Sequence, residues 1–84
     1  MVIDVLDKKL TSQELNILKE TPEIQKFLDC YCKGLGEGYS YRITSAREME
    51  VGTYLIRVKI IDDSGHYEYY ELVSDPSENV YWGR

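Results

Sequence analysis

A chain of 84 residues builds one modest domain, since a chain of this size buries only about 60% of the surface that it exposes when unfolded. Its 15 acidic residues outnumber its 10 basic residues and give a net charge of −5, which argues against direct binding to nucleic acid. Apolar residues make up 43% and charged residues 30% of the chain, ordinary values for a globular protein that exclude disorder and a membrane span.

The first residues of the chain bear on its compartment. Asp4 and Asp7 lie where a secretion signal would need an apolar core, so we expect a mature chain that begins at Met1 and stays in the cytoplasm. Cys30 and Cys32 are two apart on a predicted helix and point away from each other. With His66 as the single histidine, a zinc site is incomplete. We expect two reduced thiols, with Cys32 in the packed stripe of the helix and Cys30 at the flank of that stripe. We expect neither a metal nor a cofactor.

Two helices are predicted in the first half of the chain. Thr11 and Glu14 have capping-box spacing and predict a short helix that ends near Glu20. Thr21 and Pro22 repeat the start signal, with the Thr21 hydroxyl expected to cap the second helix. That helix has an apolar stripe with the spacing of one helical face, formed by Ile24, Phe27, Leu28, Tyr31 and Leu35.

The second half of the chain changes to the period of two that half-buried strands show. Strands are predicted over 39–51, 53–61, 66–73 and 80–82, with turns at Gly52, at 62–65 and at 74–78. The apolar face of this sheet is expected to consist of Tyr39, Tyr41, Ile43, Met49, Val51, Tyr54, Ile56, Val58, Ile60, Tyr67 and Tyr69.

Strand register is predicted by aligning apolar residues and opposite charges. Pairing Ile61 with His66 sets Lys59 beside Glu68, and pairing Glu50 with Thr53 completes the sheet. Arg47 and Glu71 then flank Ile56 at the rim of the apolar face. The predicted fold is α+β, one or two N-terminal helices on one face of a three- or four-stranded antiparallel meander. Residues 1–84 form a single domain, in which 1–20 are an extension with a short helix and 21–84 are the helix and sheet.

All the excess acid lies in the second half. Residues 1–47 carry seven acids and seven bases, whereas 48–84 carry eight acids and three bases. One interpretation is a solubilising surface, and the other is a display aimed at a basic partner. The residues of that display are Glu48, Glu50, Asp62, Asp63, Asp75 and Glu78.

A second candidate surface is an exposed aromatic patch. It would be formed by Tyr70 beside Arg57, together with Leu55, Leu72, Tyr81 and Trp82. The alternative interpretation is ordinary cross-strand pairing, in which Arg57 stacks on Tyr70.

Several stretches resemble the cystatin family. The run 21–25 resembles the opening of the stefin helix, and the runs 46–54 and 56–59 resemble the strand and hairpin that carry the Gln-x-Val-x-Gly element. By this resemblance, residues 74–76 would lie where stefins place their second inhibitory loop. Gly52 is retained, whereas Glu48 and Glu50 stand where the family has Gln and Val. The resemblance implies a helix-on-sheet fold in which the hairpin from Glu50 to Tyr54, with Val51 and Gly52, and the loop at Pro76 would enter the cleft of a papain-like protease.

Three hypotheses of function follow, and none is catalytic, because no base stands beside a nucleophile and no phosphate-binding glycine loop is present. The first is a protein-binding module that inhibits by surface occlusion and has a partner with a basic or cleft-shaped surface. The second is an acidic phage-type inhibitor of a nucleic-acid-handling enzyme, such as an anti-CRISPR. The third is self-assembly, with a homodimer formed through the Tyr70, Leu55 and Leu72 face or an open sheet edge.

Overall fold

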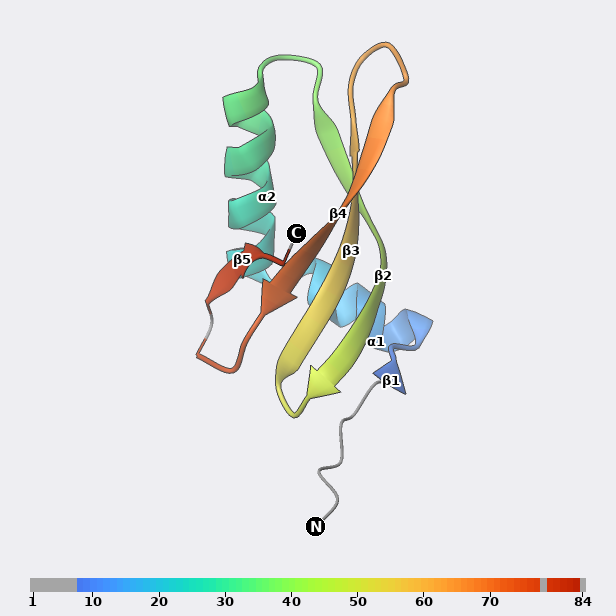
Figure 1. Cartoon of the computed structure of the whole chain (residues 1–84), viewed down its shortest axis with the longest axis vertical. Coiled ribbons are helices and arrows are strands. Elements are labelled where there is room, and N and C mark those ends of the chain that lie inside the picture. Colours follow the sequence, from blue (N-terminus) through green and yellow to red (C-terminus); the bar gives the residue numbers. More distant parts are fainter. Residues whose placement is uncertain (1–7, 78, 84) are drawn as a thin grey trace.

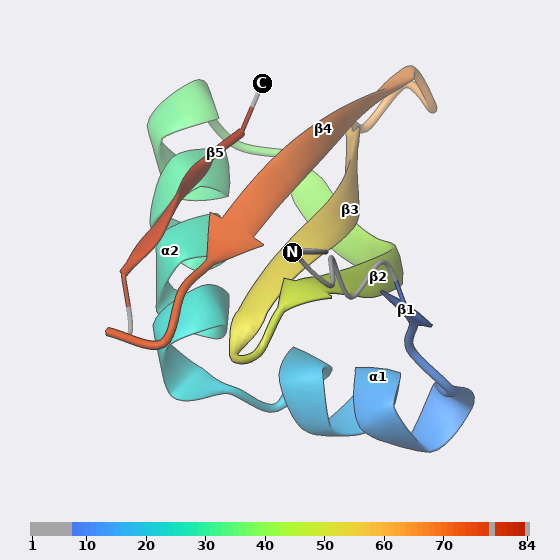
Figure 2. The same ribbon diagram turned by 60° about the horizontal axis from the view of Figure 1, so that its bottom comes forward.

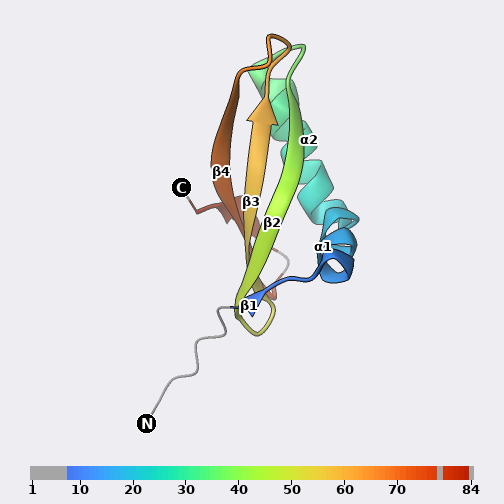
Figure 3. The same ribbon diagram turned by 90° about the vertical axis from the view of Figure 1, so that its right-hand side faces the viewer.

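The computed structural model describes residues 8–77 and 79–83 and shows an α+β fold. In chain order its elements are β1 (Lys8–Lys9), α1 (Ser12–Lys19), α2 (Pro22–Leu35), β2 (Ser40–Glu50), β3 (Thr53–Ile61), β4 (Tyr67–Ser74) and β5 (Val80–Trp82). The strands form one antiparallel meander in the order β1-β2-β3-β4-β5 (Figure 1). Both helices pack on one face of this sheet, and no described element covers the opposite face (Figure 3). The predicted fold class is confirmed.

Local sequence signals account for both helices. The Glu14 N–H donates to Thr11 Oγ1 at 3.2 Å and the Thr11 N–H donates to Glu14 Oε1 at 3.0 Å, so the predicted capping box forms. Pro22 begins α2 as expected, but the Thr21 hydroxyl donates to the Ile17 carbonyl at 3.2 Å. The expected side-chain cap is therefore wrong, because this hydroxyl joins α2 to the end of α1 instead.

The core lies between α2 and the central strands. Ile24 and Leu28 on the predicted stripe have no exposed surface, and Cys32 is buried while Cys30 is exposed, as expected. The sheet contributes Ile56, Val58, Ile60 and Leu72, and Leu18 is the buried residue of α1. The apolar stripe of α2 thus covers the sheet, although its last member, Leu35, is 42% exposed.

The sheet has one strand more than was expected, since the segment preceding α1 also pairs with it. Lys8 lies opposite Glu48 and Lys9 lies opposite Arg47. The Leu10 N–H then donates to the Ala46 carbonyl at 3.0 Å, and the Leu10 side chain packs against the core. Part of the stretch assigned to an extension is therefore an edge of the sheet.

Two irregularities in β2 overturn part of the predicted core face. The pairing of β2 with β3 shifts between Ile43 and Ser45 and again between Glu48 and Glu50. Each shift adds a residue to β2 and changes which side chains face the helices, so Ala46 is buried opposite Ile56. Arg47, expected at the rim of that face, lies instead on the opposite face. Val51 is exposed at the hairpin turn, and Tyr39 and Met49 are only partly covered.

The predicted register of β3 with β4 is wrong by one residue. Ile61 pairs with Tyr67, and the Asp62 N–H donates to the His66 carbonyl at 2.9 Å. This hairpin has a three-residue loop that ends at Gly65 with φ of +90°, a conformation in which glycine avoids the strain of a side chain. Leu72 consequently lies opposite Ile56 in the core, while the outward-facing residues of β4 are Tyr67, Tyr69, Glu71 and Val73.

Candidate functional site

The hairpin between β2 and β3 and the loop between β4 and β5 meet at one end of the sheet, which we call the hairpin end (lower end of Figure 1, closest to the viewer in Figure 2). A Cβ added to Gly52 would lie 3.0 Å from Pro76 Cγ, so the two loops are in contact. Gly52 has φ of +83°, which other residues rarely adopt. Val51, with 80% of its surface exposed, projects at the tip. Residues 24 apart in sequence thus form one surface.

Two carboxylates at the hairpin end stabilise its turns. Glu48 Oε2 accepts a hydrogen bond from the Gly52 N–H at 3.3 Å. Asp75 Oδ1 accepts from the N–H groups of Ser77 and Asn79, each at 3.0 Å. Such side-chain bonds shape tight turns. The apolar tip at Val51, together with the exposed Glu50 beside it, is consequently what this end offers to a partner.

The other predicted acidic residues lie elsewhere. Asp62 and Asp63 belong to the turn between β3 and β4, at the end of these strands away from the hairpin end. Asp62 Oδ1 accepts from the N–H groups of Ser64 and His66, each at 2.9 Å, while the Asp63 side chain lies against Gly38. Glu78 lies outside the described residues. The described acids of the predicted display therefore divide between two ends and form no single cluster.

The predicted exposed patch around Tyr70 and Trp82 is wrong, because the true register turns both residues toward α2. Trp82 makes edge-to-face contacts with Phe27 and Tyr31, at ring-centroid distances of 5.2 and 4.8 Å, and a tilted contact with Tyr70 at 5.6 Å. Leu72, one of the two leucines of that expected patch, has no exposed surface, whereas Leu55 and Tyr81 lie on the side of the sheet away from the helices. The four rings join β4 and β5 to α2, a structural role. Leu72 consequently offers no exposed surface to a second copy, and Leu55, the third residue of the expected dimer face, lies on the other side of the sheet.

The Tyr70 hydroxyl donates a hydrogen bond to Glu68 Oε2 at 2.5 Å. This hydrogen bond, with a smaller contribution from burial, raises the pKa of Tyr70 to about 12. Since the folded pKa lies above the ordinary tyrosine value of about 10, the interaction stabilises the fold fully below pH 10. That contribution is lost as the pH rises through the folded pKa of about 12.

We expect Tyr70 to ionise in a late step near pH 12 in an ultraviolet titration, while Tyr41, whose pKa is raised by burial and by Asp29, also ionises after the exposed tyrosines. Glu68→Gln removes the charged acceptor and should return this late step toward pH 10, and Tyr70→Phe should remove the step altogether. A single ionisation near pH 10 for every tyrosine of the wild-type protein would contradict the assignment.

The uncovered face of the sheet is a feature that the sequence reading missed. We call this surface the outer face. The strand register places two acidic residues on it, Glu50 and Glu71, and five basic residues, which are Lys9, Arg42, Arg47, Arg57 and Lys59. The guanidinium carbon of Arg57 lies 4.3 Å from the centroid of the Tyr69 ring, and Lys59 Nζ lies 4.1 Å from that of Tyr67. Arg57 therefore stacks on Tyr69 and not on Tyr70. The alternation of Arg57 and Lys59 in β3 was a usable signal for this face, but the register shift in β2 concealed that Arg47 joins Arg42 on it.

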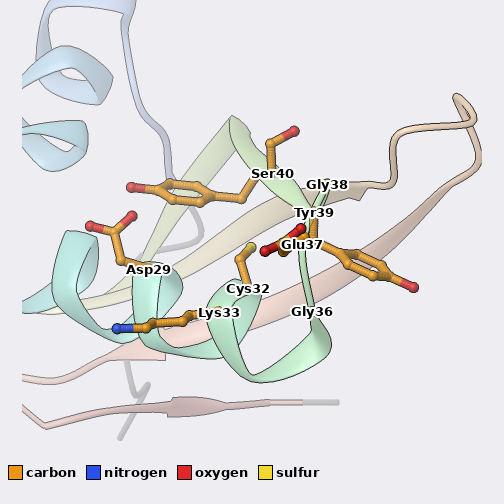
Figure 4. A pocket seen from close by; sticks show the side chains of 9 residues that line it. Asp29, Cys32, Lys33, Gly36, Glu37, Gly38, Tyr39 and Ser40 are labelled. Atoms are coloured by element: carbon orange, nitrogen blue, oxygen red, sulfur yellow. The ribbon is translucent and has the colours of Figure 1, made fainter.

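A groove of about 570 Å³ opens between the end of α2 and the start of β2 (Figure 4). Its charged residues are Asp29, Lys33 and Glu37, and Cys32 reaches it from the core. Burial, with a smaller contribution from Asp29, raises the pKa of the Cys32 thiol, so this group stays protonated at neutral pH and is a poor nucleophile. Among residues 8–77 and 79–83, no three potential ligands gather in a way that could hold a metal ion.

Ser64 and His66 form the closest approach to a nucleophile–base pair, with 3.2 Å between Ser64 Oγ and His66 Nδ1. Ser64 Oγ, however, donates to Asp62 at 2.7 Å. In a hydrolytic triad the hydroxyl donates to histidine and the carboxylate orients the far side of the ring. All three residues lie in the turn that ends β3, so this arrangement shapes a turn.

Comparison with known protein families, with curated proteins and with solved structures finds no match for this chain. In the part of the chain that the structure describes, neither helix has the length and apolar character needed to cross a membrane. What the structure defines is a two-helix, five-stranded α+β scaffold with two distinctive surfaces, the hairpin end and the outer face.

Proposed function

We propose that this protein is a small non-catalytic protein-binding module, an inhibitor that acts by surface occlusion on a cystatin-like scaffold. The observation that carries the proposal is the contact between Gly52 and Pro76. It unites, at one end of the sheet, the two loops that the resemblance to cystatins implicates in occupying a protease cleft.

The shape and chemistry of the hairpin end support this function. Val51 is an apolar side chain at the tip of a two-strand hairpin, and the pinned carboxylates of Glu48 and Asp75 hold the loops around it in defined conformations. A rigid loop loses less conformational entropy on binding than a mobile one. Because those carboxylates are engaged in turns, the same geometry gives less support to mimicry of a nucleic acid, which would need them directed outward.

The test is titration of a papain-like cysteine protease against a fluorogenic peptide substrate. We expect inhibition at about micromolar concentration of the protein, and Val51→Asp should weaken it about 30-fold if Val51 is a hot spot. The matched control is Ile17→Asp, which places the same charge at an apolar position of α1 that is 72% exposed. This variant should inhibit like the wild type.

An absence of inhibition at about 100 μM would reject a protease as the partner. Equal loss of inhibition in both variants would show that the hairpin end is not the contact surface, and would overturn the assignment of the site.

A further inference from the structure

The outer face brings basic side chains close together, although acidic residues outnumber basic residues in the chain. Arg42 lies directly opposite Lys59, and Lys59 is opposite Tyr69. Like charges at directly opposed positions destabilise a sheet. Neither Arg42, Arg57 nor Lys59 forms an ion pair with any described residue. The opposition of Arg42 and Lys59 therefore lowers stability, whereas the cation–ring contacts of Arg57 and Lys59 contribute to it.

The position of the Arg57 side chain indicates that the outer face does not pair its own opposite charges. Glu71 lies directly opposite it on β4, yet the guanidinium extends diagonally over the Tyr69 ring. Lys59 extends in the same sense over Tyr67, and the two rings contact each other edge to face at 5.6 Å. Tyr67 and Tyr69 remain 53% and 44% exposed. Arginine and tyrosine on a rigid, accessible scaffold are the residues that contribute most to protein interfaces.

We propose that the outer face is a second binding surface and that its occupant is an acidic segment of a partner protein. Charge complementarity argues for this occupant, because the described residues of the face include five bases and two acids on a protein whose net charge is −5. Carboxylates would meet guanidinium and ammonium groups there, and tyrosine rings would contact the rest of the segment.

The surroundings of the outer face favour a short acidic segment over nucleic acid. Acidic residues lie at both ends of the strands, Asp62 and Asp63 at one and Glu48 and Glu50 at the other. A polyphosphate chain that continued beyond the face along the strands would meet them, whereas a protein segment with a few carboxylates can end within the face. One side of each ring also faces a cation of this chain, which leaves less ring surface for base stacking.

The proposal is tested with a fluorescein-labelled oligoglutamate peptide, with fluorescence anisotropy measured at about 20 mM and about 150 mM salt. We expect binding that weakens as salt increases and that shifts the backbone amide resonances of β3 and β4. Arg42→Gln/Arg57→Gln should weaken binding about tenfold, because the double variant removes two exposed ionic contacts with the peptide. The charge-matched control, Lys26→Gln/Lys33→Gln on α2, should bind like the wild type.

Stability supplies an independent readout. Arg42→Gln relieves the repulsion with Lys59, so its melting temperature should equal or exceed that of the wild type while its affinity for the peptide falls. A lower melting temperature would show that Arg42 stabilises the fold, and would overturn the argument. Tighter binding of a labelled oligothymidylate than of the peptide would also overturn the proposal. Equal weakening of peptide binding in both double variants would overturn it as well. Self-association without peptide, seen by sedimentation, would assign the face to a second copy and likewise overturn the proposal. None of these outcomes depends on inhibition by the hairpin end.

Discussion

Leu72→Ala is expected to destabilise the protein by about 3 kcal/mol, because Leu72 has no exposed surface and lies opposite Ile56 at the centre of the sheet. Truncation leaves a cavity between β4 and α2 that the surrounding side chains fill only partly. For a domain of this size, 1 kcal/mol changes the melting temperature by about 4–8 °C, so a decrease of about 12–24 °C should appear in thermal unfolding followed by circular dichroism.

Tyr69→Ala is the matched control for Leu72→Ala. In the register predicted from sequence Tyr69 would face the core and Leu72 would face outward, whereas in the observed register the two residues face the opposite way. In the observed register Tyr69 faces outward with 44% of its surface exposed, and its truncation removes the stacking of Arg57. That contact is worth about 0.5–1 kcal/mol at an exposed site. A larger loss of stability in Tyr69→Ala than in Leu72→Ala would mean that the register predicted from sequence is correct and the observed one is not.

Trp82→Ala should cost about 3 kcal/mol, the low end of the range for tryptophan truncation, because Trp82 keeps some exposed surface. Its ring contacts Phe27, Tyr31 and Tyr70 and joins the last strand to α2. Edge-to-face contacts of this kind add stability beyond the buried area. Chemical denaturation followed by far-ultraviolet circular dichroism measures the free energy of unfolding without relying on tryptophan fluorescence.

The neighbouring residue serves as the control for Trp82. Tyr81 is 48% exposed on the outer face, and Tyr81→Ala should change stability by less than about 0.5 kcal/mol. Trp82→Phe should be intermediate, because it keeps an aromatic ring between Tyr31 and Tyr70. If the two alanine variants were equally stable, β5 would not be held to the helix by this cluster.

The two surfaces differ in how far sequence could predict them. The hairpin end could be anticipated, since Gly52 and Pro76 belong to turns whose residue types are recognisable and whose strands are consecutive. The outer face could not, because its existence depends on which side of each strand faces the helices. Tyr67 and Tyr69 exchange sides with Tyr70 and Leu72 when the register changes by a single residue.

The sequence by itself determined the elements whose signals are local. The capping box at Thr11, the proline at the start of α2, the apolar stripe from Ile24 and the glycines at the turns each act through neighbouring residues, and these elements formed where they were expected.

Only the tertiary structure decided the pairing of the strands. The predicted register was supported by the charge pair of Lys59 and Glu68, but such a pair contributes only about 0.2–1 kcal/mol. Burial of Leu72 and assembly of the rings around Trp82 are each worth more, and both require the three-residue loop that ends at Gly65. The first shift in β2 likewise brings both Ile43 and Ala46 into one core. Those energies depend on contacts between residues distant in the chain, which no local pattern records.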